Sequence, residues 1–252
     1  MEYANKNKLM FVDFNKFIEE TNNCKTIDEA FSLWEQELSV LGFDRVVYSL
    51  MTDHMQLDKK AGHAIIGNYP EDWMKYYVEK GYEDVDPVRK RIMVGGGAFT
   101  WDSLSDNYRK LSKEESTLMN EASDAKLLDG VGLSLSNPLG EIVGMGFASS
   151  SGKIGITPYH LSAINLLATQ FHTVFSKIEC KKDISVYDIS LTPREKEVLQ
   201  WCKEGKSNTD IATIMGISRN TVSYYFKNIF KKLGVNSRLL AVTKSTNLQI
   251  IT

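Results

Sequence analysis

Three polar side chains between residues 69 and 90 have the types and the spacing of a binding site for a small molecule. Trp73 and Tyr77 are four residues apart, so on a helix they share one face and point an indole N–H and a phenol O–H into one pocket. Asp86 precedes Pro87, which favours an extended backbone and then a new helix. Two donors and one carboxylate acceptor suit a ligand with two carbonyl oxygens and one amide N–H. Core aromatics and a helix-capping Asp86 fit the same spacing equally well.

Motifs of catalysis and metal binding are missing from the chain. Neither GxSxG nor HExxH occurs, and SSSGKIGIT lacks the glycine spacing of a phosphate-binding loop. Residues 1–60 also lack the acidic cluster and the strand-end Asp of a receiver domain. We therefore expect no catalytic residue, no metal and no cofactor. The four histidines have no ligand spacing, so we expect surface or core positions for His54, His63, His160 and His172.

The charge of the chain is divided unevenly between its two ends. The 252 residues carry a net charge of −2, which by itself argues against nucleic-acid binding. Residues 191–252, however, contain 10 Lys and Arg against 4 Asp and Glu, a charge of +6, and the remainder carries −8. This asymmetry predicts a basic nucleic-acid-binding module joined to an acidic body.

The compartment is predicted from two further features. The amino terminus interrupts its apolar residues with charges, unlike a signal peptide, and no apolar run reaches the length of a membrane span. The three cysteines, Cys24, Cys180 and Cys202, are odd in number and far apart, which fits neither a disulfide framework nor a zinc site. We expect a cytoplasmic protein that makes no contact with membranes.

Capping and strand signals predict a layered domain over residues 1–178. Thr26 with Glu29 begins a helix that Gly42 stops, and further helices begin at Pro70, Pro87, Ser112 and Thr157. The fold class is therefore α+β, with an α/β/α sandwich around a five-stranded antiparallel sheet. Its strands are predicted at residues 43–51, 63–66, 98–101, 131–136 and 141–149, with a turn at Asn137–Gly140.

Residues 191–252 are predicted to form an all-α domain of four helices, after a linker at 179–190. Thr192 caps the first helix, Ser207 the second and Ser218 the third. The turn at Gly216 between two short helices, the second rich in polar and basic residues, is typical of a helix-turn-helix that places one helix in the major groove of DNA. The alternative is a small helical dimerisation domain with a solvated basic face.

The segments PREKEVLQW, EGKSNTDIA and GISRNTVSYYFKNIFKKLGV resemble the DNA-binding domain of LuxR-type bacterial transcription regulators. This resemblance implies that the third helix, from Ser218 to Lys232, enters the major groove and that the fourth, from Ser237, supports dimerisation. Tyr225 stands where many members have His. The resemblance assigns base-facing roles to Asn220, Ser223 and Lys227, and phosphate contacts to Thr221, Lys231 and the segment Asn236–Arg238.

The stretch NYPEDWMKYY, followed by VDP and a later Trp, resembles the autoinducer-binding domain of the same family, the acyl-homoserine-lactone receptors of quorum sensing. The resemblance implies that Trp73 donates to the lactone carbonyl, that Tyr77 donates to the amide carbonyl, and that Asp86 accepts from the amide N–H. Gly146 stands where many receptors have Ser or Thr. The remaining implied roles are ring packing by Trp101, backbone room at Gly130, and pocket walls at Tyr69 and Val88.

Together these features predict a quorum-sensing transcription regulator that binds an acyl-homoserine lactone and, as a homodimer, a palindromic site in double-stranded DNA. We also expect RNA polymerase as a partner. One alternative is a regulator of the same fold that answers another amphiphile, such as a monoacylglycerol, or that needs no ligand. A second alternative, from another class, is a lactone-degrading enzyme, which would open the ring of added lactone.

Overall fold

The protein forms two compact units, each with its own hydrophobic core, in a computed structural model that describes residues 11–54, 57–106, 109–137, 140–180 and 190–251. The first unit contains the residues up to Cys180 except Asn137–Glu141, and the second contains that short segment and the residues after Cys180. Most of the predicted linker at 179–190 and the middle of the predicted turn at Asn137–Gly140 lie outside the described residues.

The first unit is built on a five-stranded, fully antiparallel sheet, as predicted from the sequence. The strand order is β2-β1-β5-β4-β3, so that β5 pairs with both β1 and β4. Trp101, predicted as the last residue of β3, instead begins a short 3-10 helix, Trp101–Leu104. The strands are β1 Arg45–Leu50, β2 Gly62–Gly67, β3 Gly97–Thr100, β4 Asp129–Ser136 and β5 Ile142–Ser149.

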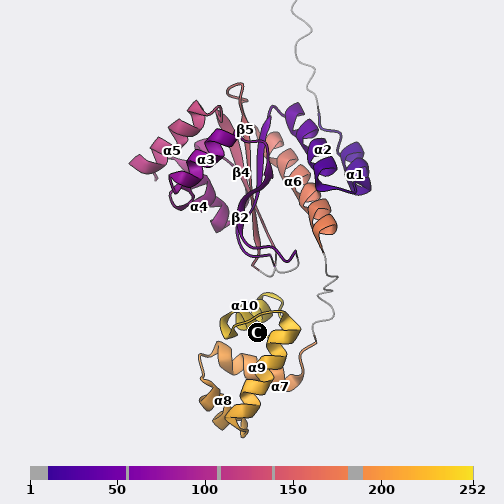
Figure 1. Ribbon diagram of the computed structural model, residues 1–252, viewed down its shortest axis with the longest axis vertical. Helices are drawn as coiled ribbons and strands as arrows, with labels where there is room; N and C mark the ends of the chain where they lie inside the picture. The colour runs from indigo at the N-terminus through magenta and orange to yellow at the C-terminus, as the bar shows by residue number, and fades with distance from the viewer. Residues whose placement is uncertain (1–10, 55–56, 107–108, 138–139, 181–189, 252) are drawn as a thin grey trace, which may run out of the picture. The chain divides into compact units, whose positions relative to one another are not determined.

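Helices cover both faces of this sheet, which confirms the α/β/α arrangement (Figure 1). The helices α1 Phe14–Asn23, α2 Ile27–Val40 and α6 Pro158–Glu179 lie on one side, where Trp34 stacks on Phe171 at 4.2 Å in the main core. The predicted capping box of Thr26 and Glu29 is present at the start of α2. The helix α1 was not predicted. On the other side lie α3 Glu71–Glu79, α4 Pro87–Val94 and α5 Lys113–Asp124.

The two central strands present very different faces to these two layers. Alternate residues of a strand point to opposite faces, so Val131, Leu133, Val143, Met145 and Phe147 enter the main core. The positions between them are glycines on the side of α3, α4 and α5. A face without side chains leaves room between the sheet and these helices. The glycines are Gly130 and Gly132 on β4 and Gly144 and Gly146 on β5.

The second unit contains the four predicted helices, α7 Pro193–Lys203, α8 Asn208–Met215, α9 Arg219–Leu233 and α10 Arg238–Asn247. Gly216 ends α8 in the left-handed conformation, with φ of 66°, and makes the turn into α9. Glu195 completes the capping box of α7 and forms an ion pair with Lys232 at 2.7 Å. This buried carboxylate therefore fixes α9 against α7, which leaves the opposite face of α9 exposed.

Candidate ligand-binding site and DNA-binding surface

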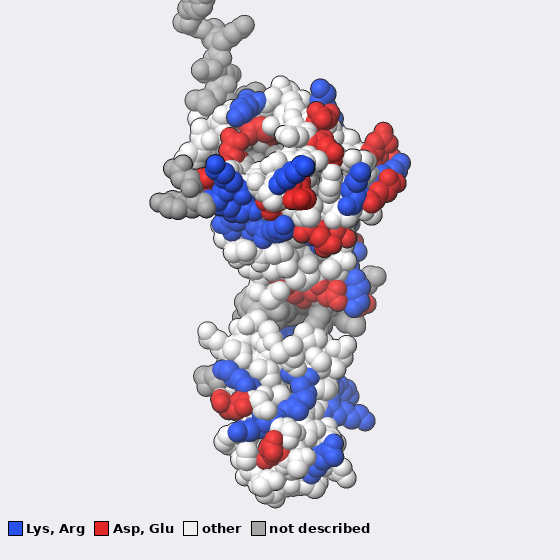
Figure 2. Space-filling model, turned by 90° about the vertical axis from the view of Figure 1, so that its left-hand side faces the viewer, with Lys and Arg blue, Asp and Glu red and all other residues white. Residues whose placement is uncertain are grey.

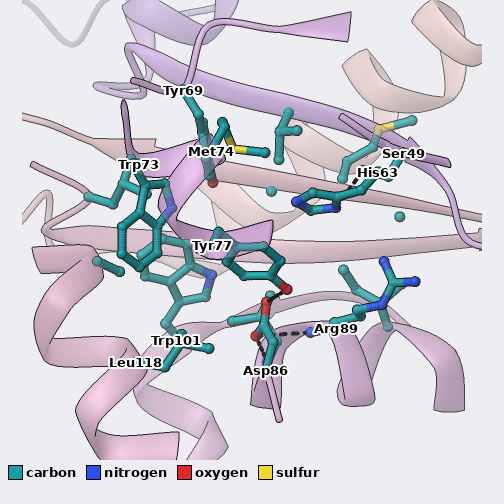
Figure 3. Close-up of a pocket in the computed structure, with 18 of the residues that line it drawn as sticks. Ser49, His63, Tyr69, Trp73, Met74, Tyr77, Asp86, Arg89, Trp101 and Leu118 are labelled. Carbon is teal, nitrogen blue, oxygen red and sulfur yellow. Dashed lines mark hydrogen bonds between the residues drawn. The ribbon is translucent and has the colours of Figure 1, made fainter. Parts of the chain in front are cut away.

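A cavity lies between the glycine-rich face of the sheet and the helices α3, α4 and α5 (Figure 3). The volume of this cavity is about 70 Å³, several times what one water molecule needs. Its walls are mainly apolar, with a few polar groups, as is typical of pockets for small ligands. The structure brings together here seven of the eight predicted ligand-binding residues: Tyr69, Trp73, Tyr77, Asp86, Val88, Trp101 and Gly146.

The eighth residue, Gly130, lies behind the wall of the cavity rather than in it. A Cβ atom at this position would lie 2.5 Å from the indole of Trp101 and 2.6 Å from the carbonyl oxygen of Phe147. The ring of Trp101 therefore packs directly on the Gly130 backbone. A glycine is therefore required at this position, as predicted, but the room that it leaves is filled by the indole of Trp101 and not by the cavity.

The carboxyl group of Asp86 accepts three hydrogen bonds at the first turn of α4. Its Oδ1 accepts from the backbone N–H groups of Val88 at 2.7 Å and Arg89 at 3.2 Å, so Asp86 is the N-cap of this helix. Its Oδ2 accepts from the hydroxyl of Tyr77 at 2.9 Å. The capping role and the cavity-facing role, which the sequence offered as alternatives, are thus held by one side chain. Oδ2 of Asp86 has acceptor capacity beyond the hydrogen bond from Tyr77, and this oxygen is the acceptor that a ligand can reach.

The surroundings of this carboxyl group are poor in water. Burial raises the pKa of Asp86, although the hydrogen bonds from Tyr77, Arg89 and Val88 work in the opposite direction. Burial, together with the nearby Asp86 charge, also raises the pKa of Tyr77, so its hydroxyl stays a donor at neutral pH. Hydrogen bonds made in such a site are stronger than those exposed to water.

The two tryptophans bring indole N–H groups to the cavity. The Nε1 atom of Trp101 is buried and has no hydrogen-bond partner among the described residues. Buried donors are nearly always paired, so an unpaired one in a cavity wall is a natural donor for a ligand. Figure 3 shows the indole nitrogen of Trp73 turned toward the cavity.

Gly146 and Tyr69 meet at the floor of the cavity. A Cβ atom at Gly146 would lie 2.7 Å from the hydroxyl oxygen of Tyr69 and 3.1 Å from Val47. Burial raises the pKa of Tyr69, which keeps this hydroxyl protonated. The space that a serine or threonine would fill at Gly146 is therefore partly occupied by the Tyr69 hydroxyl, which supplies a donor in nearly the same place.

The residues that the sequence analysis missed form the rest of the wall. Among them are three polar groups, Ser49 on β1, His63 on β2 and Arg89 on α4. The alternation of glycine with large apolar residues in GVGLSLS and IVGMGFAS could have indicated the open face of the sheet. The apolar residues missed are Val47, Met51, Met74, Ile92, Leu118, Met119, Ala122, Leu127 and Met145, and Gly144 lies among them.

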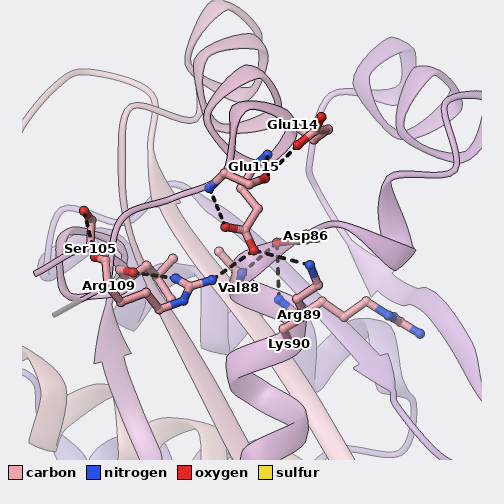
Figure 4. Close-up of polar contacts among 10 residues, drawn as sticks. Asp86, Val88, Arg89, Lys90, Ser105, Arg109, Glu114 and Glu115 are labelled. Carbon is pink, nitrogen blue, oxygen red and sulfur yellow. Dashed lines mark hydrogen bonds and ion pairs between the residues drawn. The ribbon is translucent and has the colours of Figure 1, made fainter.

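A buried carboxylate joins two of the three helices that line the cavity, α4 and α5 (Figure 4). Glu115, in the first turn of α5, accepts from Lys90 of α4 at 3.3 Å and from Arg109 at 2.9 Å, and caps the helix through the backbone of Ser112 at 3.0 Å. Burial works against the charged form, but these partners lower the pKa of Glu115 overall. The charged network fixes the start of α5 to the helix that begins at Asp86.

The exposed face of α9 carries most of the predicted DNA-binding residues. Asn220, Ser223, Lys227 and Lys231 are exposed, and Thr221 is half-buried. The face of the second unit seen in Figure 2 bears more Lys and Arg than Asp and Glu. Tyr224, which the sequence analysis did not select, lies on the same helix with 62% of its surface exposed. Polar, basic and aromatic side chains on one helix face suit the edges of bases in a major groove.

Arg238, the sixth predicted DNA-binding residue, is engaged within the second unit. Its guanidinium lies over the ring of Phe226, 4.9 Å from the centroid, and donates to the carbonyl of Lys206 at 2.6 Å and to the sulfur of Cys202 at 3.2 Å. These contacts fix the start of α10 against α7 and α9. A phosphate contact by Arg238 would use only the donors that remain.

Comparison with known proteins assigns both units. Residues 26–175 match the family model of the autoinducer binding domain, and residues 189–245 match that of bacterial regulatory proteins of the luxR family. The chain belongs to the luxR family. This luxR-family protein is 29% identical to the transcriptional activator protein AnoR of Acinetobacter nosocomialis, over 90% of its own length and 94% of the relative's. It is 28% identical to the transcriptional activator protein LuxR of Aliivibrio fischeri, over 90% and 89%.

Solved structures show the same fold. The crystal structure of Escherichia coli SdiA matches this luxR-family protein with a TM-score of 0.65 and 24% identity, over 95% of this chain and 98% of that one. SdiA in complex with octanoyl-rac-glycerol matches with a TM-score of 0.64. The protein is thus a ligand-responsive transcription regulator of the quorum-sensing type, whose ligand is a small molecule rather than a cofactor. Across the described ranges, no cluster of three or more His, Cys, Asp or Glu could hold a metal, and no helix could span a membrane.

Proposed function

We propose that this protein binds an N-acyl-homoserine lactone in the cavity of its first unit and answers by binding DNA as a homodimer in the cytoplasm. The observation that carries the proposal is the arrangement of donors and one acceptor around the cavity. Trp73, Trp101 and the buried hydroxyl of Tyr69 supply donors for carbonyl oxygens, and Asp86 supplies an acceptor for an amide N–H. The apolar wall beyond them suits an acyl chain, at about 0.8 kcal/mol for each buried methylene.

The ligand acts in this proposal by binding linkage. A molecule that fills the cavity joins the sheet to α3, α4 and α5, so it binds the folded first unit and not the unfolded chain. Ligand at about 100 times its dissociation constant then stabilises the folded protein by about 2.7 kcal/mol. The DNA-competent form becomes more populated as a consequence.

The DNA-binding part of the proposal rests on α9 and α10. Asn220, Ser223 and Lys227 on the exposed face of α9 read base edges, and Thr221 and Lys231 contact phosphates. The helix α10 exposes Leu239 by 75% and Leu240 by 48%, an apolar pair that a second copy of the chain would cover. A two-fold dimer reads a palindromic site, and RNA polymerase is the partner that an activator would recruit.

A monoacylglycerol is the second candidate ligand. The structure of SdiA with octanoyl-rac-glycerol shows such a ligand in a protein of the same fold. A glycerol ester lacks the amide N–H, but a glycerol hydroxyl can donate to Asp86 in its place. The absence of a hydroxyl at Gly146 does not favour either ligand.

One titration tests the proposal and separates the two ligands. Octanoyl-homoserine lactone and 1-octanoylglycerol are added separately to the purified full chain, and the affinity for a fluorescent palindromic DNA is measured. We expect the lactone to strengthen DNA binding at a lower concentration than the glycerol ester. Stronger DNA binding with the glycerol ester alone would assign the second ligand, and no effect of either compound would refute the proposal.

A further inference from the structure

The cavity has a second polar region, away from the groups that hold the lactone and the amide. It is formed by Ser49, His63 and Arg89, three side chains from three different elements. Figure 3 shows Ser49 and His63 on the side of the cavity opposite Trp73 and Trp101. An acyl chain needs no polar partner, so these groups are costly in the wall of a purely apolar tunnel.

The distance of this region from the amide-binding groups follows from the register of the strands. Val47 pairs with Gly146, beside the hydroxyl of Tyr69, and Ser49 pairs with Gly144. Two residues along a strand cover about 6.8 Å. The second polar region therefore lies several carbon atoms further along an acyl chain that starts near Tyr69.

A distortion of the sheet places His63 here. The register of β2 against β1 shifts between Tyr48 and Leu50, and Ala64 has a φ of 48°, which residues with a side chain seldom adopt. The backbone N–H of Ala64 donates to the Ser49 hydroxyl at 2.9 Å, which holds the distortion in place. Bulges of this kind re-aim side chains, and strained backbone is found at functional sites.

The three side chains offer donors to the cavity. The Ser49 oxygen already accepts from the backbone N–H of Ala64, so its O–H is left to donate. The contact of this hydroxyl with His63 Nδ1 is long, at 3.5 Å. His63 stacks on Tyr77, with ring centroids 4.8 Å apart. Among the described residues, the side-chain contacts of the Arg89 guanidinium are distant ones, at 3.7 Å to the sulfur of Met51 and 4.0 Å to Glu83. Its five N–H groups therefore have capacity for a closer acceptor.

We propose that this donor group, which we call the distal subsite (Ser49, His63 and Arg89), recognises an oxygen acceptor carried by the acyl chain several carbons beyond the amide. The cavity would then select a lactone with an oxygenated chain over one with a plain alkyl chain. The inference rests on the proposed function, because the lactone and amide groups set the direction of the chain. A carboxylate and a neutral hydroxyl are the two sources of such an oxygen.

The test compares three lactones of the same chain length with the full-length protein. Octanoyl-homoserine lactone is the plain ligand, and its analogues carry a terminal hydroxyl or a terminal carboxylate. Dissociation constants are measured by calorimetry. We expect at least one oxygenated lactone to bind about tenfold or more tightly than the plain one, a difference typical of one added polar contact.

Variants assign the preference to the distal subsite. Arg89→Met is expected to remove the preference, so that the oxygenated and the plain lactones bind this variant with similar affinities. Ser49→Ala is the second variant, which serves if Arg89→Met does not fold. It is expected to reduce the preference for the oxygenated lactone. Lys75→Met is the control, because Lys75 is a cation of the same unit whose side chain is 70% exposed and whose ion pair with Glu71 is long, at 3.9 Å.

The outcomes separate the two proposals. Equal affinities of the wild-type protein for all three lactones, or a preference that survives both Arg89→Met and Ser49→Ala, would overturn the distal subsite and leave the proposed function standing. If none of the three lactones binds, the proposed function fails and the distal subsite fails with it. Loss of the preference in Lys75→Met as well would show that it depends on overall charge, which also overturns the subsite.

Discussion

Replacement of Asp86 by Asn tests the ligand-binding role of this residue with little change in shape. An Asn side chain still caps α4, because its oxygen accepts from the N–H groups of Val88 and Arg89 and because Asn is as good an N-cap as Asp. What changes is the second oxygen, which becomes an NH₂ group facing Tyr77. The site then loses its acceptor for the ligand amide N–H, and the folded state loses little.

The magnitude follows from the charge on the lost acceptor. A hydrogen bond to a charged group contributes about 1.5–3 kcal/mol, and each 1.4 kcal/mol is a tenfold change in affinity, so Asp86→Asn should weaken ligand binding by about 10- to 150-fold. Because the pKa of Asp86 is raised, its carboxyl group is partly protonated in acidic solution. The loss of ligand affinity in Asp86→Asn should therefore be smaller there than at neutral pH.

The assay is a ligand titration of a DNA-binding reporter, together with thermal unfolding of each purified variant. Asp84→Asn is the matched control, since Asp84 lies two residues away and is exposed. We expect a normal response in Asp84→Asn and a shifted one in Asp86→Asn, with similar unfolding midpoints in the absence of ligand. An unchanged half-maximal ligand concentration in Asp86→Asn would refute the assignment, and so would a response lost only through unfolding.

Three further predictions address the DNA surface, the cavity floor and the pH dependence. Lys227→Ala should relax the preference at one position in each half of a palindromic site, at about 1–3 kcal/mol, while Lys231→Ala weakens all sequences alike; identical selected sequences for the wild type and Lys227→Ala would exclude a base contact. Gly146→Ser should shift the ligand preference toward shorter or 3-oxo-substituted chains, because the new side chain meets the Tyr69 hydroxyl; an equal loss for every lactone would contradict this. Burial first, and then the Arg89 charge, lower the pKa of His63 from 6.5 to about 4. As the pH falls, His63 is therefore protonated in the unfolded chain before it is protonated in the folded protein. Lowering the pH from 7 to 5 should reduce the free energy of unfolding by about 2 kcal/mol through this residue. Chemical denaturation at the two pH values should show that His63→Gln lacks this part of the loss.

Local hydrogen bonds explain why most elements could be predicted from the sequence. The capping boxes that begin at Ser112 and Thr192 satisfy backbone groups within four residues, so their signals do not depend on the rest of the fold. The helix α1 was missed although Phe14 and Phe17 have helical spacing and Asp13 caps its first turn, because its ten residues are shorter than the window of about 11–18 residues over which helical periodicity is recognised.

The composition of the cavity depended on tertiary structure in a way that the sequence did not reveal. Trp73 and Tyr77 were predictable because four residues on a helix define one face. His63 could not be placed, since the face to which it points depends on a bulge at Ala64. Arg238 was assigned to phosphate by position, but its contacts with Phe226 and Cys202 depend on the packing of three helices.

Mass spectrometry of the small molecule extracted from the purified full chain shows directly whether the cavity holds an acyl-homoserine lactone. The protein is expressed with and without a supplied mixture of acyl-homoserine lactones, and Asp86→Asn is prepared in parallel. We expect about one intact lactone per wild-type chain, enriched over the supplied mixture, and much less from Asp86→Asn. A different amphiphile in the cavity, a ring-opened product, or no bound lactone at all would contradict this expectation.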